Sequence, residues 1–93
     1  MKVLLTGWQY MDFPARDDPN KKIQGYNLYL AIEKEHVNGF IPVSDEGKRF
    51  ISLTSANKLG VSQSFLAQHE LNLLDVDVDF NGKICDIREW NGD

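Results

Sequence analysis

Two segments near the end of the chain constrain its fold most, because apolar and polar residues alternate in each and an Asn-Gly pair separates them. The segments cover residues 74–80 and 83–90, and the pair is Asn81-Gly82. Alternation with a period of two places every other side chain on one face of a β-strand. Asn-Gly favours a type I′ turn between antiparallel strands. The sequence therefore predicts a β-hairpin at this end of the chain.

Two longer segments with strand character occupy the first third of the chain. Residues 3–13 are rich in β-branched, aromatic and aliphatic side chains, and Pro14 ends the stretch because proline lacks a backbone donor. Residues 23–33 alternate, which places Tyr29 on the less apolar face of a second strand. The polar residues 15–22 are predicted to form a loop or a hairpin tip.

The chain is predicted to reverse after the second strand. A helix is the competing interpretation over residues 30–36. However, Asn38-Gly39 with the apolar residues 40–43 behind it is a strong hairpin signal. Because proline cannot donate to a central ladder, Pro42 indicates that this region is an edge or a bulge.

One more strand and one short helix follow. A polar turn over residues 45–48 leads into an alternating strand over 49–54, in which Phe50 faces away from its neighbour Ile51. Ser62 can cap a short helix whose apolar residues lie at helical spacing. No other helix is predicted.

The predicted elements occur in the order strand, loop, strand, turn, strand, short helix, strand, strand. This is the order of the five-stranded antiparallel OB barrel, with its helix between the third and fourth strands. SH3-like barrels share parts of the order and are an alternative. At 93 residues the chain is expected to form a single, mainly β domain over residues 1–93.

The composition indicates a cytoplasmic protein. No apolar run approaches the length needed to cross a bilayer, and the first residues lack a signal-peptide core. Cys85 is the only cysteine, so no internal disulfide can form, whereas a secreted domain of this size would usually need one. We expect no membrane partner.

Motifs that carry catalysis are missing from the sequence. His36 and His69 do not belong to an H-E-x-x-H pair, no serine lies in a G-x-S-x-G elbow, and Lys48 does not end a phosphate-binding P-loop. We therefore predict that the chain is not an enzyme and that it has no catalytic residues and no cofactor.

One pattern of acidic residues at alternate positions resembles a known motif. Asp75, Asp77 and Asp79 resemble the opening of a calcium loop, but Phe80 stands where that loop needs glycine, so no metal site is predicted. On a strand these carboxylates would share one solvated face. Such a face suits a basic protein partner, and a phage-encoded inhibitor or regulator is the alternative function.

Basic and aromatic side chains gather in the first two thirds of the chain. Residues 1–60 hold eight Lys and Arg against seven Asp and Glu, whereas residues 61–93 hold two against seven, and the whole chain has a net charge of -4. Exposed rings stack on bases, and Lys and Arg bind phosphates. The predicted nucleic-acid-binding residues are Arg16, Lys21, Lys22, Tyr26, Tyr29, Arg49, Phe50 and Lys83.

One segment also resembles a known family. The run NKKIQGYNLYL, residues 20–30, follows a strand and an irregular loop. It resembles the matching region of small phage and plasmid single-stranded DNA-binding proteins with an OB fold, most clearly the helix-destabilising proteins of filamentous phages. The resemblance covers residues 2–32. It implies that Lys21, Lys22, Tyr26 and Tyr29 contact single-stranded DNA and that the protein is a homodimer.

The resemblance also implies a mode of action. The protein would coat transient single strands, without catalysis, during replication or transfer of a phage or other mobile element. RNA remains an alternative ligand, because stacking and phosphate contacts do not distinguish the two nucleic acids.

Overall fold

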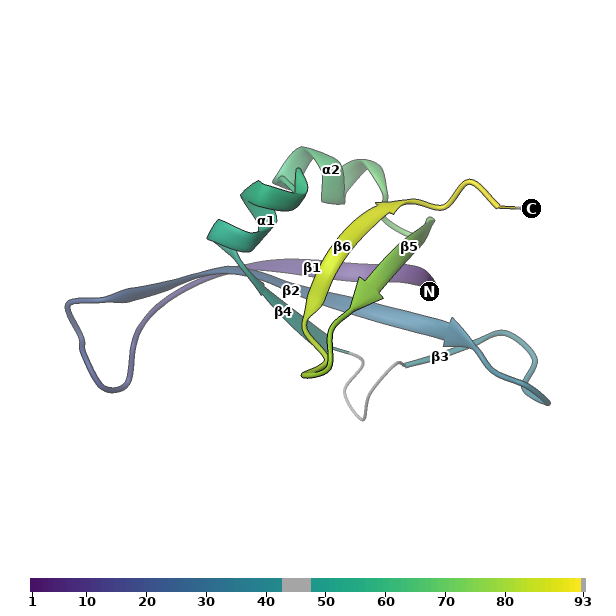
Figure 1. Ribbon diagram of the computed structural model, residues 1–93, viewed down its shortest axis with the longest axis horizontal. Helices are drawn as coiled ribbons and strands as arrows, with labels where there is room; N and C mark the ends of the chain where they lie inside the picture. Colours follow the sequence, from purple (N-terminus) through teal and green to yellow (C-terminus); the bar gives the residue numbers. More distant parts are fainter. Residues whose placement is uncertain (43–47, 93) are drawn as a thin grey trace.

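A long antiparallel ribbon of two strands forms the centre of the sheet. A computed structural model describes residues 1–42 and 48–92 of the protein (Figure 1). In it, β1 (Lys2–Pro14) pairs with β2 (Lys22–Glu33), and the register shifts at a bulge between Leu5 and Gly7. The two strands predicted at residues 3–13 and 23–33 are confirmed, and the competing helix over 30–36 is wrong.

The other strands attach to the two edges of this ribbon. On one edge, β3 (Phe40–Pro42) and β4 (Lys48–Ser52) pair with different parts of β2. On the other, β5 (Leu73–Val78) pairs with the start of β1, and β6 (Ile84–Glu89) pairs with β5. The described sheet therefore has the order β3-β2-β1-β5-β6, with β4 beside β2. Pro42 lies in an edge strand, as predicted.

Two short helices connect β4 to β5. The helix α1 (Leu53–Leu59) begins directly after β4, and α2 (Gln63–Gln68) begins after Ser62. The Ser62 hydroxyl accepts a hydrogen bond from the backbone N–H of Phe65, so the predicted helix and its cap are confirmed. Within the described residues, no helix is long and apolar enough to cross a membrane.

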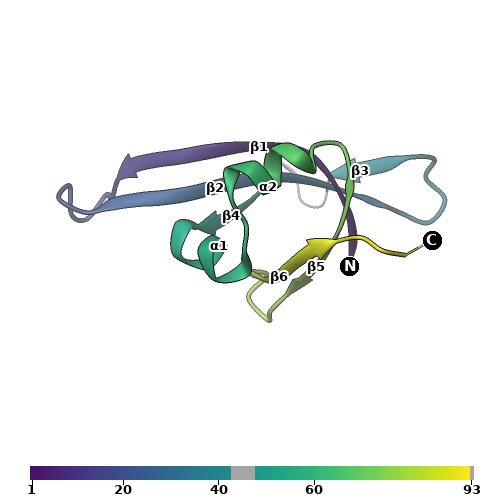
Figure 2. The same ribbon diagram turned by 90° about the horizontal axis from the view of Figure 1, so that it is seen from above.

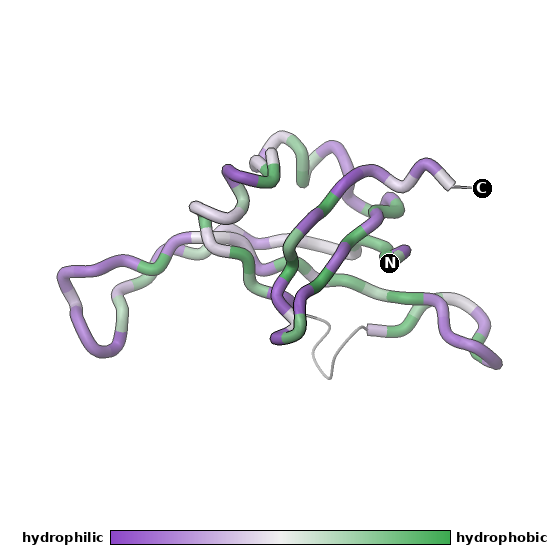
Figure 3. Tube along the Cα trace, viewed as in Figure 1, coloured by the Kyte–Doolittle hydropathy of each residue, from purple (hydrophilic) through white to green (hydrophobic). Residues whose placement is uncertain are grey.

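The hydrophobic core lies on one side of the ribbon. Both helices and the β5–β6 hairpin lie on that side (Figure 2). They cover inward-facing side chains of β1 and β2, whereas Figure 3 shows the tip of the β1–β2 hairpin as hydrophilic. The largest fully buried side chains are Leu5, Leu28, Leu66, Leu74, Val3, Val61 and Val76. Burial of this one set of apolar side chains is the main force that holds the elements together.

The sheet is not closed into a barrel, which corrects one part of the predicted fold. In the described part of the chain, β4 pairs only with β2, and β6 pairs only with β5. The described residues form six strands instead of five, because residues 40–42 form a strand of their own. The mainly β, antiparallel architecture is confirmed.

The missed helix α1 has a local cause. The alternating pattern predicted a strand over 49–54, but β4 ends at Ser52. The Ser52 hydroxyl accepts a hydrogen bond of 3.2 Å from the backbone N–H of Ser55, and Gly60 ends the helix in the left-handed region at φ 75°. Ser52 therefore acts as a helix N-cap, and this cap overrides two residues of strand alternation.

The turn between β5 and β6 also differs from the prediction. A type I′ turn needs positive φ at both central residues, but of the pair Asn81-Gly82 only Gly82 has one, at 78°. The Asp79 carboxylate instead accepts hydrogen bonds from the N–H groups of Asn81 and Lys83 at 2.9 and 3.0 Å. The hairpin is confirmed, whereas its turn spans residues 79–83 and is not of type I′.

The other two predicted turns have different outcomes. The chain does reverse at Asn38-Gly39, but through a wider loop, because the last β2 pair joins Glu33 to Phe40. The polar turn predicted at 45–48 lies almost wholly outside the described residues.

Gly25 is the position in β2 where a side chain would damage the packing. A Cβ there would collide with the carbonyl oxygen of Ile51 and lie 2.7 Å from Cζ of Phe50. We expect Gly25→Ala to lower the free energy of unfolding by about 2 kcal/mol, because overpacking of a filled site forces backbone shifts. Urea denaturation followed by circular dichroism measures this change.

Gly7→Ala is the matched control for this substitution. A Cβ at Gly7 would meet only Cδ2 of Tyr29, at an ordinary distance of 3.9 Å. Its effect should stay below about 1 kcal/mol. Equal losses in the two variants would contradict the packing assigned to Gly25.

Candidate functional site

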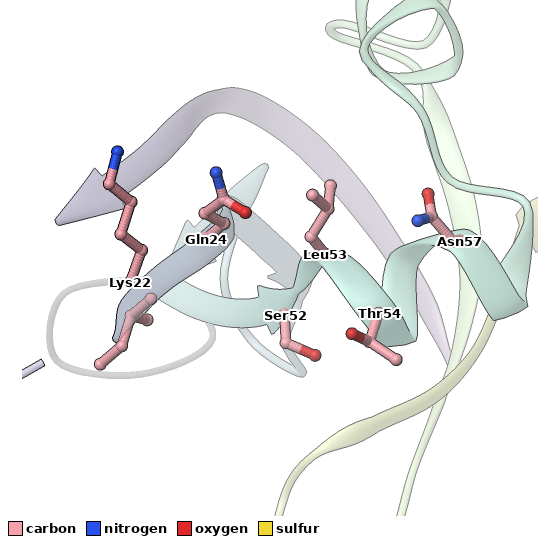
Figure 4. Close-up of a pocket in the computed structure, with 7 residues that line it drawn as sticks. Lys22, Gln24, Ser52, Leu53, Thr54 and Asn57 are labelled. Carbon is pink, nitrogen blue, oxygen red and sulfur yellow. The ribbon is translucent and has the colours of Figure 1, made fainter. Parts of the chain in front are cut away.

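A groove lies around the end of β4, where the strand meets β2, α1 and the β5–β6 turn. Two cavities that share Ser52 form it, with volumes of about 290 and 220 Å³. We call them together the β4 groove. In the first cavity, Figure 4 shows Lys22 and Gln24 on β2 and Thr54 and Asn57 on α1. The lining residues of the β4 groove are Lys22, Ile23, Gln24, Phe50, Ile51, Ser52, Leu53, Thr54, Ser55, Asn57, Lys83 and Ile84.

The lining chemistry of the β4 groove favours an anion. Lys22 lines one cavity and Lys83 lines the other, with hydroxyl and amide side chains between them. A third cavity of about 160 Å³ adjoins at Ser55 and Ile84 and adds Lys58. Among the described residues, no carboxylate lines any of the three cavities, although the chain carries 14 acidic residues against 10 basic ones. Lysine ammonium groups bind phosphates as point charges.

One lining residue of the groove, Phe50, has an exposed aromatic ring. Phe50 lies on the sheet face that points away from the core, opposite Asn27 in the register, and is 43% exposed. Its ring lies against Gly25, where a side chain would displace it. A large ring held against backbone and open to solvent can stack on a base.

A second exposed ring near the lysines of the groove was not among the residues predicted from the sequence to bind nucleic acid. Phe80 is fully exposed in the turn that also carries Lys83. As the last residue of the strand predicted over 74–80, Phe80 indicated only where that strand ends. Ser55 and Lys58 were missed for a different reason, because the sequence did not predict α1. The Ser-x-x-Ser spacing of Ser52 and Ser55 was the available signal.

The structure brings some of the predicted nucleic-acid-binding residues together. Lys22, Phe50 and Lys83 line the β4 groove. Arg49 lies on the opposite face of β4 from Phe50 and lines a separate cavity of about 220 Å³ that also contacts Ile84. Arg49 therefore approaches the β5–β6 turn from the other side of the strand.

The remaining predicted residues lie elsewhere. Arg16 and Lys21 are exposed at the tip of the β1–β2 hairpin, which projects away from the helices (Figure 1). Tyr29 is half-buried on the same outer face as Phe50, and its hydroxyl donates a hydrogen bond of 3.4 Å to Oε1 of Gln9. The tip residues are separate from the groove, whereas Tyr29 shares its sheet face.

Tyr26 is a correction to the predicted site. It is only 4% exposed, and its ring makes edge contacts with Trp8 and Tyr10 at centroid distances of 6.2 and 5.7 Å. Its position in the β2 alternation puts it on the core face with Leu28. Tyr26 is therefore a core residue and cannot stack on a base.

The predicted acidic face is largely paired within the protein. Arg88 donates hydrogen bonds to Asp75 at 2.9 Å and Asp77 at 3.2 Å, and also to Asp86. The N-terminal ammonium of Met1 lies 2.8 Å from Asp75. Asp79 is not part of this cluster, because its carboxylate caps the β5–β6 turn. The surface offered to a basic partner is thus smaller than the alternation predicted.

The histidines do not form a site with other titratable groups. The His69 ring stacks on Phe65, and its Nδ1 lies 2.7 Å from the Phe65 carbonyl oxygen. His36 is exposed beside Glu35 in the turn after β2. Among the described residues, no three His, Cys, Asp or Glu side chains gather as metal ligands would.

The Asp75 cluster gives a testable pH dependence. The pKa of the Asp75 carboxyl lies below its ordinary value, chiefly because the Met1 ammonium donates a hydrogen bond to it, and the charge of Arg88 adds to the effect. Because the folded pKa is the lower one, the cluster stabilises the fold above the unfolded pKa of about 3.9. The stabilisation is lost as the pH falls through the folded pKa. Arg88→Gln should raise the Asp75 pKa in a carboxyl-detected NMR titration, and Arg88→Lys should raise it less. No change in either variant would contradict the assigned pairing.

Comparison of the chain with protein-family models, with curated proteins and with solved structures finds no match. The chemistry of the β4 groove, with lysines in both cavities and Phe50 beside it, is therefore the basis for assigning a function.

Proposed function

We propose that this protein is a non-catalytic binder of single-stranded nucleic acid, which lies in the β4 groove and stacks on Phe50. The observation that carries the proposal is a groove whose lining, among the described residues, includes lysines but no carboxylate, in a chain with net charge -4. Acidic residues elsewhere do not prevent binding, because the Asp75 cluster is paired with Arg88 and lies on the outer face of the β5–β6 hairpin.

The strand pairings support an OB-like fold for this function. The pairs β1–β2, β2–β4, β1–β5 and β5–β6 follow the order of an OB barrel, in which a final contact between β4 and β6 would close the sheet. OB folds bind oligonucleotides on their second and third strands and on the adjacent loops. Here those elements are β2, β4 and the turns at 15–21 and 79–83, and the β4 groove runs among them.

The expected binding mode is sequence-tolerant. Each stacked base contributes about 1 to 3 kcal/mol, and lysine–phosphate contacts add a salt-dependent part. Lys22, Lys83 and Lys58 would hold phosphates, and Phe50 would stack on a base, with Tyr29 next to it on the same face. In line with the resemblance of residues 2–32, the protein would coat transient single strands of a phage or other mobile element in the cytoplasm.

The lysines of the groove are tested by their salt dependence. We expect Lys22→Gln/Lys83→Gln to weaken binding of a labelled oligo-dT strand and to lower the slope of log K against log salt by roughly 1.4, about 0.7 for each lost phosphate contact. Fluorescence anisotropy between about 50 and 200 mM salt measures both quantities. Lys34→Gln is the control, because Lys34 is exposed in the β2–β3 turn, outside the groove. If the two variants behave alike, the groove is not the site.

The stacking contribution of Phe50 is tested separately. Phe50→Leu keeps an apolar side chain over Gly25 but removes the ring, so the affinity for oligo-dT should fall about 5- to 100-fold, as expected for one lost stacking platform. Phe40→Leu is the matched control, because Phe40 is exposed to a similar degree (37%) on β3. No binding by the wild-type protein at low salt would refute the proposed function. Equal competition by polyglutamate would show that the groove recognises anions in general.

A further inference from the structure

One buried amide lies on the sheet face that carries Phe50. Asn27 of β2 is only 7% exposed, whereas every other Asn and Gln that the structure describes is more exposed. Its neighbours Tyr26 and Leu28 belong to the core. Because Tyr26 and Leu28 differ in facing, with Tyr26 and Leu28 inward and Asn27 between them, the alternation of the strand turns the Asn27 side chain outward. The amide is therefore covered by side chains of the outer face and not by the core.

The amide of Asn27 has no partner within the described part of the chain. No hydrogen bond joins it to another group there. It is not sealed from solvent, because the only fully enclosed polar side-chain atom without a partner among the described residues is Nε1 of Trp90. A buried polar group left unsatisfied costs free energy, so nearly all such groups in folded proteins are paired. The Asn27 amide is thus available to a ligand on the outer face.

The strand register places Asn27 between an aromatic ring and a second amide. Phe50 on β4 lies directly opposite Asn27 on one side, and Gln9 on β1 lies directly opposite it on the other. Since neighbouring strands are about 4.8 Å apart, the three side chains form one row across the outer face. The Phe50 ring leans over Gly25, two positions before Asn27 on the same face of β2. The row offers one ring for stacking and two amides for hydrogen bonding.

We propose that Asn27 reads the edge of the base that stacks on Phe50, and that the base it selects is adenine. An amide presents a donor and an acceptor side by side. Adenine matches this pattern on both of its edges, because its 6-amino group lies between the acceptors N1 and N7, and Asn and Gln are its usual side-chain partners. The inference rests on the proposed function, since it requires a base on Phe50.

The other bases fit this row less well. Guanine presents the acceptors O6 and N7 on one edge, which suit Arg or Lys, and cytosine presents an amino group that suits a carboxylate. The row of Phe50, Asn27 and Gln9 carries no charge. Thymine has a donor beside an acceptor on one edge only, and its ring is smaller than that of a purine. Stacking and lysine contacts tolerate any sequence, so the preference concerns the one base that lies over Phe50.

A single base change in an oligo-dT strand tests this preference. The wild-type protein should bind a strand with one central adenine about 5- to 100-fold more tightly than the all-thymine strand, as expected for one bidentate contact between an amide and a base. A strand with unsubstituted purine at that position keeps the ring but lacks the 6-amino group, and it should lose most of the gain. Purine that binds as tightly as adenine would overturn the proposal, because stacking alone would then explain the preference.

Asn27→Ala tests the residue itself. The strand with one adenine should then bind no more tightly than the all-thymine strand, while binding of the all-thymine strand should change little. Because the amide makes no hydrogen bond within the described part of the chain, the urea midpoint should also change little. Asn38→Ala is the control, since Asn38 is exposed in the β2–β3 turn, and it should keep the adenine preference.

The outcomes separate this inference from the function on which it rests. Equal binding of the two strands by the wild-type protein, or an adenine preference that survives Asn27→Ala, would overturn the role of Asn27 and leave the proposed function standing. Binding of neither strand at low salt would overturn both.

Discussion

Pairing of β1 with β2 is the interaction on which the rest of the structure depends. The bulge between Leu5 and Gly7 lets Leu5 and Trp8, three residues apart, face the same core as Leu28 and Leu30. Without it, a strict alternation would turn one end of β1 away from the core, because the side-chain period of a strand is two. The helices, β4 and the β5–β6 hairpin then attach to surfaces that this ribbon has already defined.

The β4 groove exists because β4 stops early. Ser52 uses its hydroxyl as the cap of α1, so the strand ends there and its outer edge does not reach β6. The unfilled space is lined by short polar side chains of α1 and by lysines from β2 and from the β5–β6 turn. The edge of β4 thus carries lysines and hydroxyl groups, which suits an anionic ligand.

Local sequence signals predicted the elements well where contacts between near neighbours in the sequence decide the local structure. The alternation at 23–33 and at 74–80, the cap at Ser62 and the reversals at the two Asn-Gly pairs all rest on contacts between near neighbours. Prediction failed where two local preferences competed. Ser52 fits the alternation of a strand, but its hydroxyl also caps a helix. Asn81-Gly82 favours a two-residue turn, but the Asp79 carboxylate accepts a hydrogen bond from the Asn81 N–H and holds a wider one.

The sequence by itself determined that the chain is mainly β, where its strands lie, and that Phe50 and Tyr29 face away from the core, because side-chain alternation is a property of the strand alone. The tertiary structure decided that Tyr26 is a core residue and that Lys22 and Lys83, far apart in the chain, line one groove. It also decided that Arg88 pairs with Asp75, Asp77 and Asp86 on the acidic face and that the sheet stays open. These outcomes depend on which strand edges meet, and long-range pairing is set by packing of the whole core and not by any local pattern.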